Sequence, residues 1–161
     1  MSKIIVVSED PVKGKDKHNV AGMNNLKPPQ GPAPYSGIGE FDYKGTMKTN
    51  LSDFVKIDGV PVATIKSKSQ LDPGEAAGGG HAPNKGASWK PPAPPPDPMT
   101  LKITDPVGTG VVSSGSGSTY VKNGGSAVLL DGDAIDTCDG VGQKKNSKVS
   151  AKGQSFVRCS G

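Results

Sequence analysis

Two histidines and two cysteines are the side chains in this sequence best suited to bind a soft metal ion. They are His18, His81, Cys138 and Cys159. Their spacing matches no zinc-finger pattern, so no short motif assigns them a role. The residues alone are compatible with a closed Cys2His2 metal site, with a disulfide between the cysteines, or with buried thiols and two surface histidines. Synthesis in a reducing cytoplasm argues against the disulfide.

Other catalytic constellations are missing from the sequence. It shows no Ser/His/Asp set, no carboxylate pair in a catalytic context and no phosphate-binding loop. We therefore expect a protein that is not an enzyme. The least favoured alternative is a zinc enzyme built on the same four side chains, with water in place of one of them.

Composition limits the kind of fold that must position these side chains. Only 32% of the 161 residues are hydrophobic and 4% aromatic, with 23 glycines and 15 prolines, which leaves little material for a large core. No window has the 3.6-residue period of an amphipathic helix, so we expect an all-β fold. We predict a single domain over residues 1–161, with irregular Pro- and Gly-rich loops at about 22–44 and 69–100.

The charge and hydropathy patterns bear on partners and location. The net charge is +4, but the lysine-rich runs carry almost no aromatic residues on which bases could stack, so we expect no nucleic-acid partner. No apolar run approaches the length of a membrane helix, and the N-terminus lacks a cleavable signal. These features predict synthesis in the cytoplasm and no stable membrane insertion.

A short pattern recurs along the chain and indicates the strands. Residues 54–65 (FVKIDGVPVATI) and 120–131 (YVKNGGSAVLLD) share an aromatic residue, Val, Lys and a glycine turn. A third copy, residues 156–161 (FVRCSG), begins the same way. Asp-Gly and Gly-Gly pairs suit hairpin turns because these turns need positive φ. The pattern predicts three β-hairpin units, the third turning at Ser160-Gly161.

With these units the sequence resembles the PAAR-repeat and PAAR-like proteins, the spike tips of contractile injection systems. The stretch VKIDGVPVA (55–63) is similar to the family's Asn/Asp-Gly-x-Pro-Val/Ala portion, and GDAIDTCDG (132–140) to its Gly-Asp turn with the cysteine that follows. The resemblance covers residues 45–63 and 108–161. It departs from the family where the first unit has Lys66-Ser67 in place of Gly-Asp, and the literal Pro-Ala-Ala-Arg is absent.

The resemblance implies a fold and a function. The fold is a cone of three β-hairpin repeats around a pseudo-threefold axis, and the protein caps a trimeric spike at one tip per spike trimer. The machine is a type VI secretion system or a phage tail-like particle, into which a tip made in the cytoplasm is assembled and delivered outside the cell. Effector cargo is a further expected partner. An alternative function is an adaptor module whose Pro-rich loops bind an effector or a host protein.

The resemblance also implies a structural metal, zinc or else iron, that sharpens the tip. Family members hold it with His and Cys side chains from the turns after the repeat strands. Cys138 stands in the cysteine position, and His81 and His18 correspond to the turns of other units. Cys159 is the remaining soft side chain for a fourth ligand, although it lies in a repeat strand. The expected metal ligands are therefore His18, His81, Cys138 and Cys159.

Overall fold

The computed structural model describes residues 1–25, 31–72, 81, 99–105, 107–138 and 141–160. In these residues the chain forms thirteen strands and no helix, which confirms the expected all-β class. It follows that no described helix is long and apolar enough to cross a membrane.

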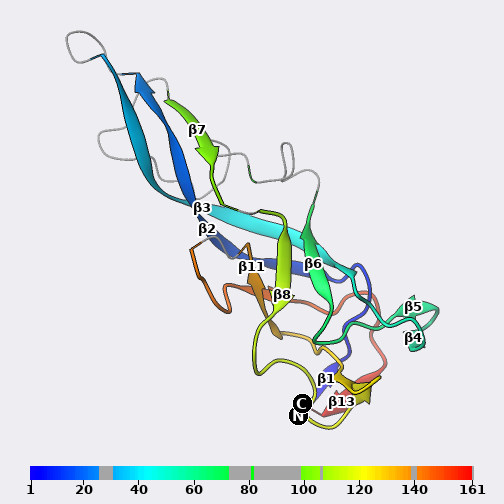
Figure 1. The fold of residues 1–161 in the computed structure, drawn as a ribbon. Coiled ribbons are helices and arrows are strands. Elements are labelled where there is room, and N and C mark those ends of the chain that lie inside the picture. The colour runs from blue at the N-terminus through cyan, green and yellow to red at the C-terminus, as the bar shows by residue number, and fades with distance from the viewer. Residues whose placement is uncertain (26–30, 73–80, 82–98, 106, 139–140, 161) are drawn as a thin grey trace.

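Six strands close into an antiparallel ring around the main core (Figure 1). In order they are β12 (Ser147–Val149), β11 (Ala134–Thr137), β8 (Thr109–Val112), β6 (Lys68–Leu71), β3 (Pro32–Thr49) and β2 (Pro11–Asn25), and β12 pairs again with β2. Alternate residues of β6 and β12 are buried, as expected for strands with one face inward. The interior is narrow, since a Cβ on Gly110 would lie 2.4 Å from Ser69 Oγ. The core inside the ring therefore uses few large side chains, chiefly Val12, Tyr43, Met47, Leu71, Ile135 and Val149.

The strands β2 and β3 continue beyond the ring as a long arm. They pair along their whole length, from Pro11↔Thr46 to Asn25↔Pro32, and β7 (Met99–Ile103) adds to the outer part of β2. The irregular loop expected at 22–44 is therefore strand at residues 22–25 and 32–44. Proline is tolerated here because β3 has no second described neighbour on this stretch, so a missing N–H at its outer edge breaks no ladder. Most of the loop expected at 69–100, namely residues 73–80 and 82–98, lies outside the described residues.

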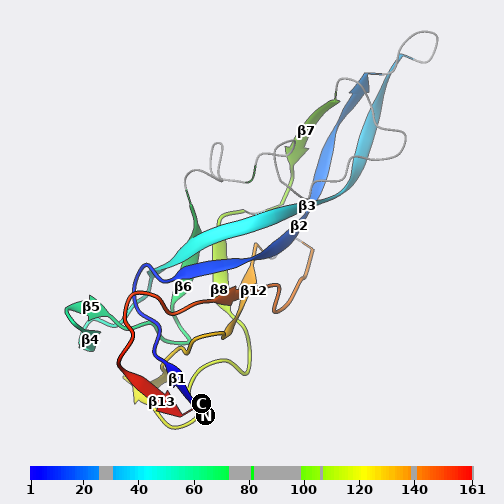
Figure 2. The same ribbon diagram turned by 180° about the vertical axis from the view of Figure 1, so that it is seen from behind.

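Three two-stranded antiparallel pairs occupy the opposite end, and we call each of them a hairpin, although no turn connects the strands of the third. The first joins β4 (Lys56–Ile57) to β5 (Val60–Pro61) and the second joins β9 (Lys122–Asn123) to β10 (Ser126–Ala127). Their turns have positive φ at Asp58-Gly59 and Gly124-Gly125, which confirms both predicted turns. The third differs from the prediction, because β13 (Arg158–Ser160) pairs with β1 (Ser2–Ile4) from the other end of the chain (Figure 2).

The segments that follow the hairpins join one another in a closed ring. Isolated bridges link Ile5↔Leu130, Val7↔Val62 and Thr64↔Val128. Between them Val6 N donates to Leu129 O, Leu129 N to Ala63 O and Ala63 N to Val6 O, each at 2.9 Å. A second, smaller core fills this end of the molecule and consists of Ile5, Val7, Ile57, Val62, Val128 and Leu130.

Candidate metal centre

Four buried side chains with metal-binding atoms gather where the arm leaves the strand ring. Asp16 and His18 belong to β2, Cys138 directly follows β11, and His81 stands alone between two segments that are not described. One ligand atom from each of the four lies within 4.8 Å of the others. These four residues form a group that can hold a metal ion.

The strand period explains how β2 supplies two of the four. Side chains two residues apart on a strand point to the same face, so Asp16 and His18 face inward together. Phe41, which pairs with Asp16 from β3, stacks on the His81 ring with centroids 5.3 Å apart and planes 12° apart. Tyr43 meets the same ring edge-on at 6.3 Å. Aromatic contacts from β3 therefore hold His81 beside the β2 residues.

His18 gives the strongest indication of a missing ligand. Its side chain is fully buried, and among the described residues neither ring nitrogen has a hydrogen-bond partner. Leaving such a group unpaired costs about 1–3 kcal/mol. Nε2 lies 4.0 Å from Asp16 Oδ2, a separation that suits two ligands of one ion. A metal ion would satisfy His18, whereas an ordinary core histidine would have a partner already.

Asp16 is oriented by its neighbours so that one oxygen is left for the cluster. Its Oδ1 accepts hydrogen bonds from the Thr137 hydroxyl and from Asn146 Nδ2, the latter at 2.8 Å. Its Oδ2 lies 3.0 Å from His81 Nε2, which donates to it. Metal ligands are commonly held by such outer hydrogen bonds. Asp16 Oδ2 is therefore the carboxylate oxygen that lies closest to a histidine of the cluster.

The surroundings of Cys138 and His18 favour their neutral forms. Burial and the nearby Asp16 charge raise the pKa of the Cys138 thiol well above its ordinary value, although Gly108 N donates a hydrogen bond to the sulfur at 3.3 Å. Burial also lowers the pKa of His18, with partial compensation from Asp16. Both groups are therefore neutral at pH 7. Cys138 could bind a divalent cation as a thiolate, because a coordinated thiol loses its proton.

The structure brings together three of the four residues expected from the sequence and replaces the fourth. His18, His81 and Cys138 meet in the cluster. Cys159 instead lies in β13, where it is half-buried and packs against the second core. Both cysteines are free, so the disulfide alternative is not realised. Asp16 takes the fourth place, and its residue type gave no sign of this role, because aspartate is common on protein surfaces.

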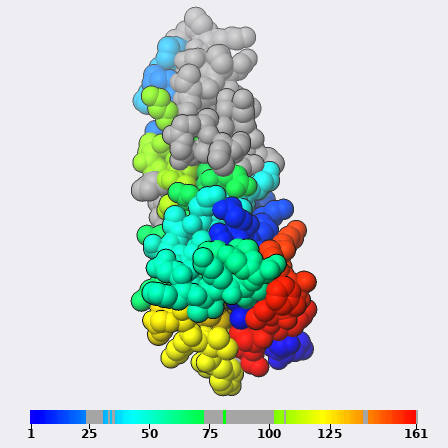
Figure 3. All heavy atoms as spheres, turned by 90° about the vertical axis from the view of Figure 1, so that its right-hand side faces the viewer, coloured from blue at the N-terminus to red at the C-terminus, as the bar shows by residue number. Residues whose placement is uncertain are grey.

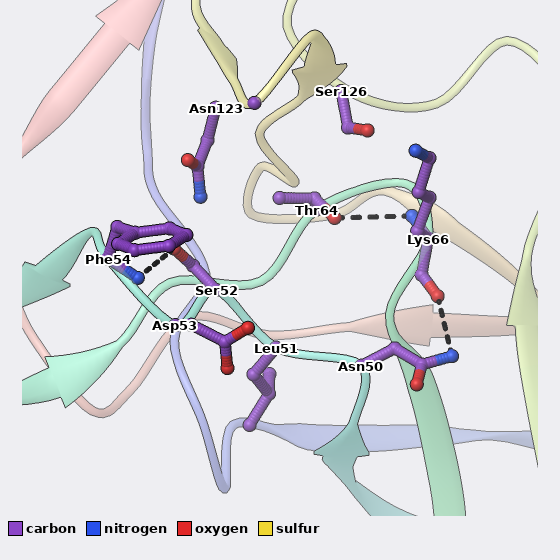
Figure 4. Close-up of a pocket in the computed structure, with 10 residues that line it drawn as sticks. Asn50, Leu51, Ser52, Asp53, Phe54, Thr64, Lys66, Asn123 and Ser126 are labelled. Atoms are coloured by element: carbon purple, nitrogen blue, oxygen red, sulfur yellow. Dashed lines mark hydrogen bonds between the residues drawn. The ribbon is translucent and has the colours of Figure 1, made fainter.

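A second recess lies among the hairpins (Figure 4). It has a volume of about 310 Å³ and is bordered by Asp53, Phe54, Lys66 and Asn123 among others. Lys66 N donates to Thr64 Oγ1 at 3.3 Å, and Asn50 Nδ2 donates to Lys66 O at 3.4 Å. Its lining contains no histidine or cysteine. The buried cluster is therefore the better candidate for a functional site.

Comparison with known protein families, with curated proteins and with solved structures finds no match to this chain. The functional argument therefore rests on the cluster and on the arrangement of the strands around it.

Proposed function

We propose that this protein is a non-enzymatic, PAAR-like spike tip of a contractile injection system. It caps a trimeric spike with its hairpin end, and a structural metal stabilises the junction where the β2–β3 arm leaves the strand ring. In this proposal the chain is a cone of three β-hairpin repeats around a pseudo-threefold axis. The protein is made in the cytoplasm and then assembled into a type VI secretion system or a phage tail-like particle.

The observation that carries the proposal is a set of equivalent hydrogen bonds at the hairpin end. Besides the closed ring of Val6, Ala63 and Leu129, the segment that follows each hairpin donates the same backbone hydrogen bond to the segment that precedes that hairpin. The three bonds are Ile5 N to Val157 O, Val62 N to Val55 O and Val128 N to Val121 O, each 3.1 Å. A single chain with three equivalent segments suits a partner with true threefold symmetry.

Three exposed aromatic residues at equivalent positions support a docking face. Phe54, Tyr120 and Phe156 are 92%, 75% and 65% exposed. Each stands in a turn in which a buried side chain, Ser52, Ser118 or Gln154, accepts hydrogen bonds from the backbone N–H groups of the aromatic residue and of the valine after it. Large apolar side chains held on rigid turns are typical of protein interfaces.

The donor set supports a structural metal in the cluster. Carboxylate, two imidazoles and a thiolate suit zinc, and iron is the second choice. Four protein ligands leave no open coordination position, so the ion would stabilise the fold and would not activate water. A structural zinc contributes on the order of 10 kcal/mol to folding.

The adaptor alternative rests on the Pro-rich stretches at residues 26–37 and 90–98. Residues 26–30 and 90–98 lie outside the described residues, and the remaining part of the first stretch includes the start of β3. We therefore retain effector cargo only as a secondary partner of the proposed tip.

Mixing the protein with the trimeric spike protein from the same genome tests the cap. We expect one chain per three spike chains in size-exclusion chromatography with light scattering. Replacing Phe54, Tyr120 and Phe156 together by alanine should weaken binding by more than about 100-fold, because interface aromatics dominate affinity. It should leave thermal stability unchanged, since all three side chains are exposed.

Ile38→Ala provides the matched control, because Ile38 is an exposed apolar residue on the arm. It should bind the spike like the wild type. A 1:1 ratio of tip chains to spike chains, or full binding by the triple variant, would contradict the proposed cap.

A further inference from the structure

The second nitrogen of His18 faces a carboxylate outside the four-residue cluster. Nε2 lies 4.0 Å from Asp16 Oδ2, while Nδ1 lies 3.9 Å from Asp105 Oδ2. The Asp105 side chain is only 12% exposed. A neutral imidazole that binds a metal through one nitrogen carries its proton on the other. If Nε2 faces the ion, the Nδ1 proton is therefore directed at Asp105.

Asp105 is fixed to the residue that follows His18. Its carboxylate accepts hydrogen bonds from Asn19 N and from Asn19 Nδ2, the latter at 3.0 Å. The preceding residue, Thr104, donates to Asn19 O from its backbone N at 2.9 Å and from its hydroxyl at 3.1 Å. These contacts continue the β7–β2 ladder, whose first pair is Val20↔Ile103. The end of β7 is thus attached to β2 beside the proposed metal ligand.

We propose that Asp105 is a positioning residue for the metal and couples metal binding to the docking of β7. The inference rests on the proposed metal site. Asp105 holds the Nδ1 proton of His18, which fixes the tautomer and directs Nε2 toward the ion. The separation of 3.9 Å exceeds a hydrogen bond, so we expect metal binding to close it. Because Asp105 also holds Asn19, a closed contact would tighten the junction of β7 with β2.

A pair of variants separates positioning from simple anchoring. Asp105→Asn keeps the size of the side chain and one acceptor for Asn19 but removes the charge that faces His18. Thr104→Val removes a neighbouring hydrogen bond to Asn19 and does not touch the ring. In competition with a zinc chelator, Asp105→Asn should bind Zn²⁺ about 10–100-fold more weakly than the wild type, the usual loss for an outer partner of a metal ligand. The Zn²⁺ affinity of Thr104→Val should stay within about twofold of that of the wild type, since Asp105 still faces His18 in this variant.

Two measurements test whether Asp105 fixes the His18 tautomer and couples zinc binding to the β7–β2 junction. Both are made first on the wild-type protein. Nitrogen-edited NMR of the zinc-loaded protein should show His18 bound through Nε2 with a slowly exchanging Nδ1 proton. Zinc should also slow amide hydrogen exchange at Asn19 and Thr104. In Asp105→Asn the proton signal and the zinc-dependent protection should both disappear.

The outcomes distinguish this role from the metal site on which it rests. Equal zinc affinities in the wild type and Asp105→Asn, or equal losses in both variants, would overturn the role of Asp105 and leave the metal site standing. Zinc bound to His18 through Nδ1 would have the same effect. A wild-type chain that takes up no zinc would overturn the metal site and the role of Asp105 together.

Discussion

At the scale of single residues, His18 is the member of the buried cluster whose polar atoms are unsatisfied. His18 has two buried nitrogens that find no hydrogen-bond partner in the part of the chain that the structure describes. Asp16, in contrast, is held in place by Thr137 and Asn146. An unsatisfied buried group inside a satisfied scaffold calls for an explanation, and a bound ion is one that fits these side chains.

The two cysteines provide a matched test of the ligand set. Cys138→Ser should lower zinc content from about one ion per chain to near zero and should lower the thermal midpoint, because one of four ligands is lost. Cys159→Ser should keep the full zinc content, since Cys159 packs in the second core. Elemental analysis after dialysis and thermal unfolding with and without chelator measure both effects. If Cys159→Ser lost zinc and Cys138→Ser kept it, the assignment of Cys138 as the metal ligand would be contradicted.

At the scale of elements, the same side-chain hydrogen bond closes the turn after each segment of the closed ring, including the turn that lacks the Gly-Asp pair. After each segment of the closed ring, a side chain accepts a hydrogen bond from the backbone N three residues earlier: Asp10 from Val7, Ser67 from Thr64 and Asp133 from Leu130. Ser67 thus replaces the carboxylate that the first unit lacks. A missing Gly-Asp pair therefore does not remove the turn, because a serine hydroxyl can serve as the acceptor.

The strand β11 also depends on a buried carboxylate. Asp136 Oδ1 accepts hydrogen bonds from the Ser113 hydroxyl and from Lys145 N, and the Lys144 ammonium lies 3.6 Å from Oδ2. Burial alone would raise the pKa of Asp136. The bond from Lys145, the bond from Ser113 and the charge of Lys144 outweigh burial, so the pKa lies below its ordinary value of 3.8.

The lowered pKa predicts acid sensitivity. The unfolded chain binds the proton more readily than the folded one, so the stabilisation is complete above pH 3.8 and is lost as the pH falls below it. Asp136→Asn should lower the free energy of unfolding at pH 7 by about 2 kcal/mol. It should also flatten the part of the stability curve between about pH 2 and pH 4. Urea unfolding of the metal-free protein across this pH range measures both effects. If the free energy of unfolding of Asp136→Asn changed with pH in parallel with that of the wild type, the stabilising role of the Asp136 carboxylate would be contradicted.

At the scale of the whole molecule, the hairpin end is assembled from both ends of the chain. Figure 3 shows the N-terminal and C-terminal segments beside residues near 120 at one end of the molecule. The strands β1 and β13 pair there in the same antiparallel manner as the other two hairpins. The third hairpin therefore differs from the others mainly in lacking a covalent turn.

A circular permutant tests this arrangement. A short Gly-Ser linker should join the chain ends, and new ends should be opened between Gly124 and Gly125 in the exposed turn of the second hairpin. Because the linker only replaces one turn by another, the permutant should fold with a stability within about 1 kcal/mol of the parent. A control opened between Asp16 and Lys17 should lose zinc binding and much of its stability. A permutant that fails to fold would show that β1 and β13 do not form the third hairpin.

The sequence by itself determined the features that depend on local chemistry. Scarce apolar residues and frequent glycine and proline favoured an all-β fold. The turns at Asp58-Gly59 and Gly124-Gly125 follow from the positive φ that these residues tolerate. Three of the four cluster residues were expected because His and Cys are rare in the chain.

Only the tertiary structure decided which distant segments meet. Strand pairing brought β13 to β1 and so placed the half-buried Cys159 against the second core and outside the metal-binding cluster. Pairing of β2 with β3 turned a stretch that reads as loop into an arm, and it directed Asp16 inward beside His18. An aspartate is common on any surface, so its type carries no signal. Its role becomes visible only when burial and the neighbouring imidazoles define its environment.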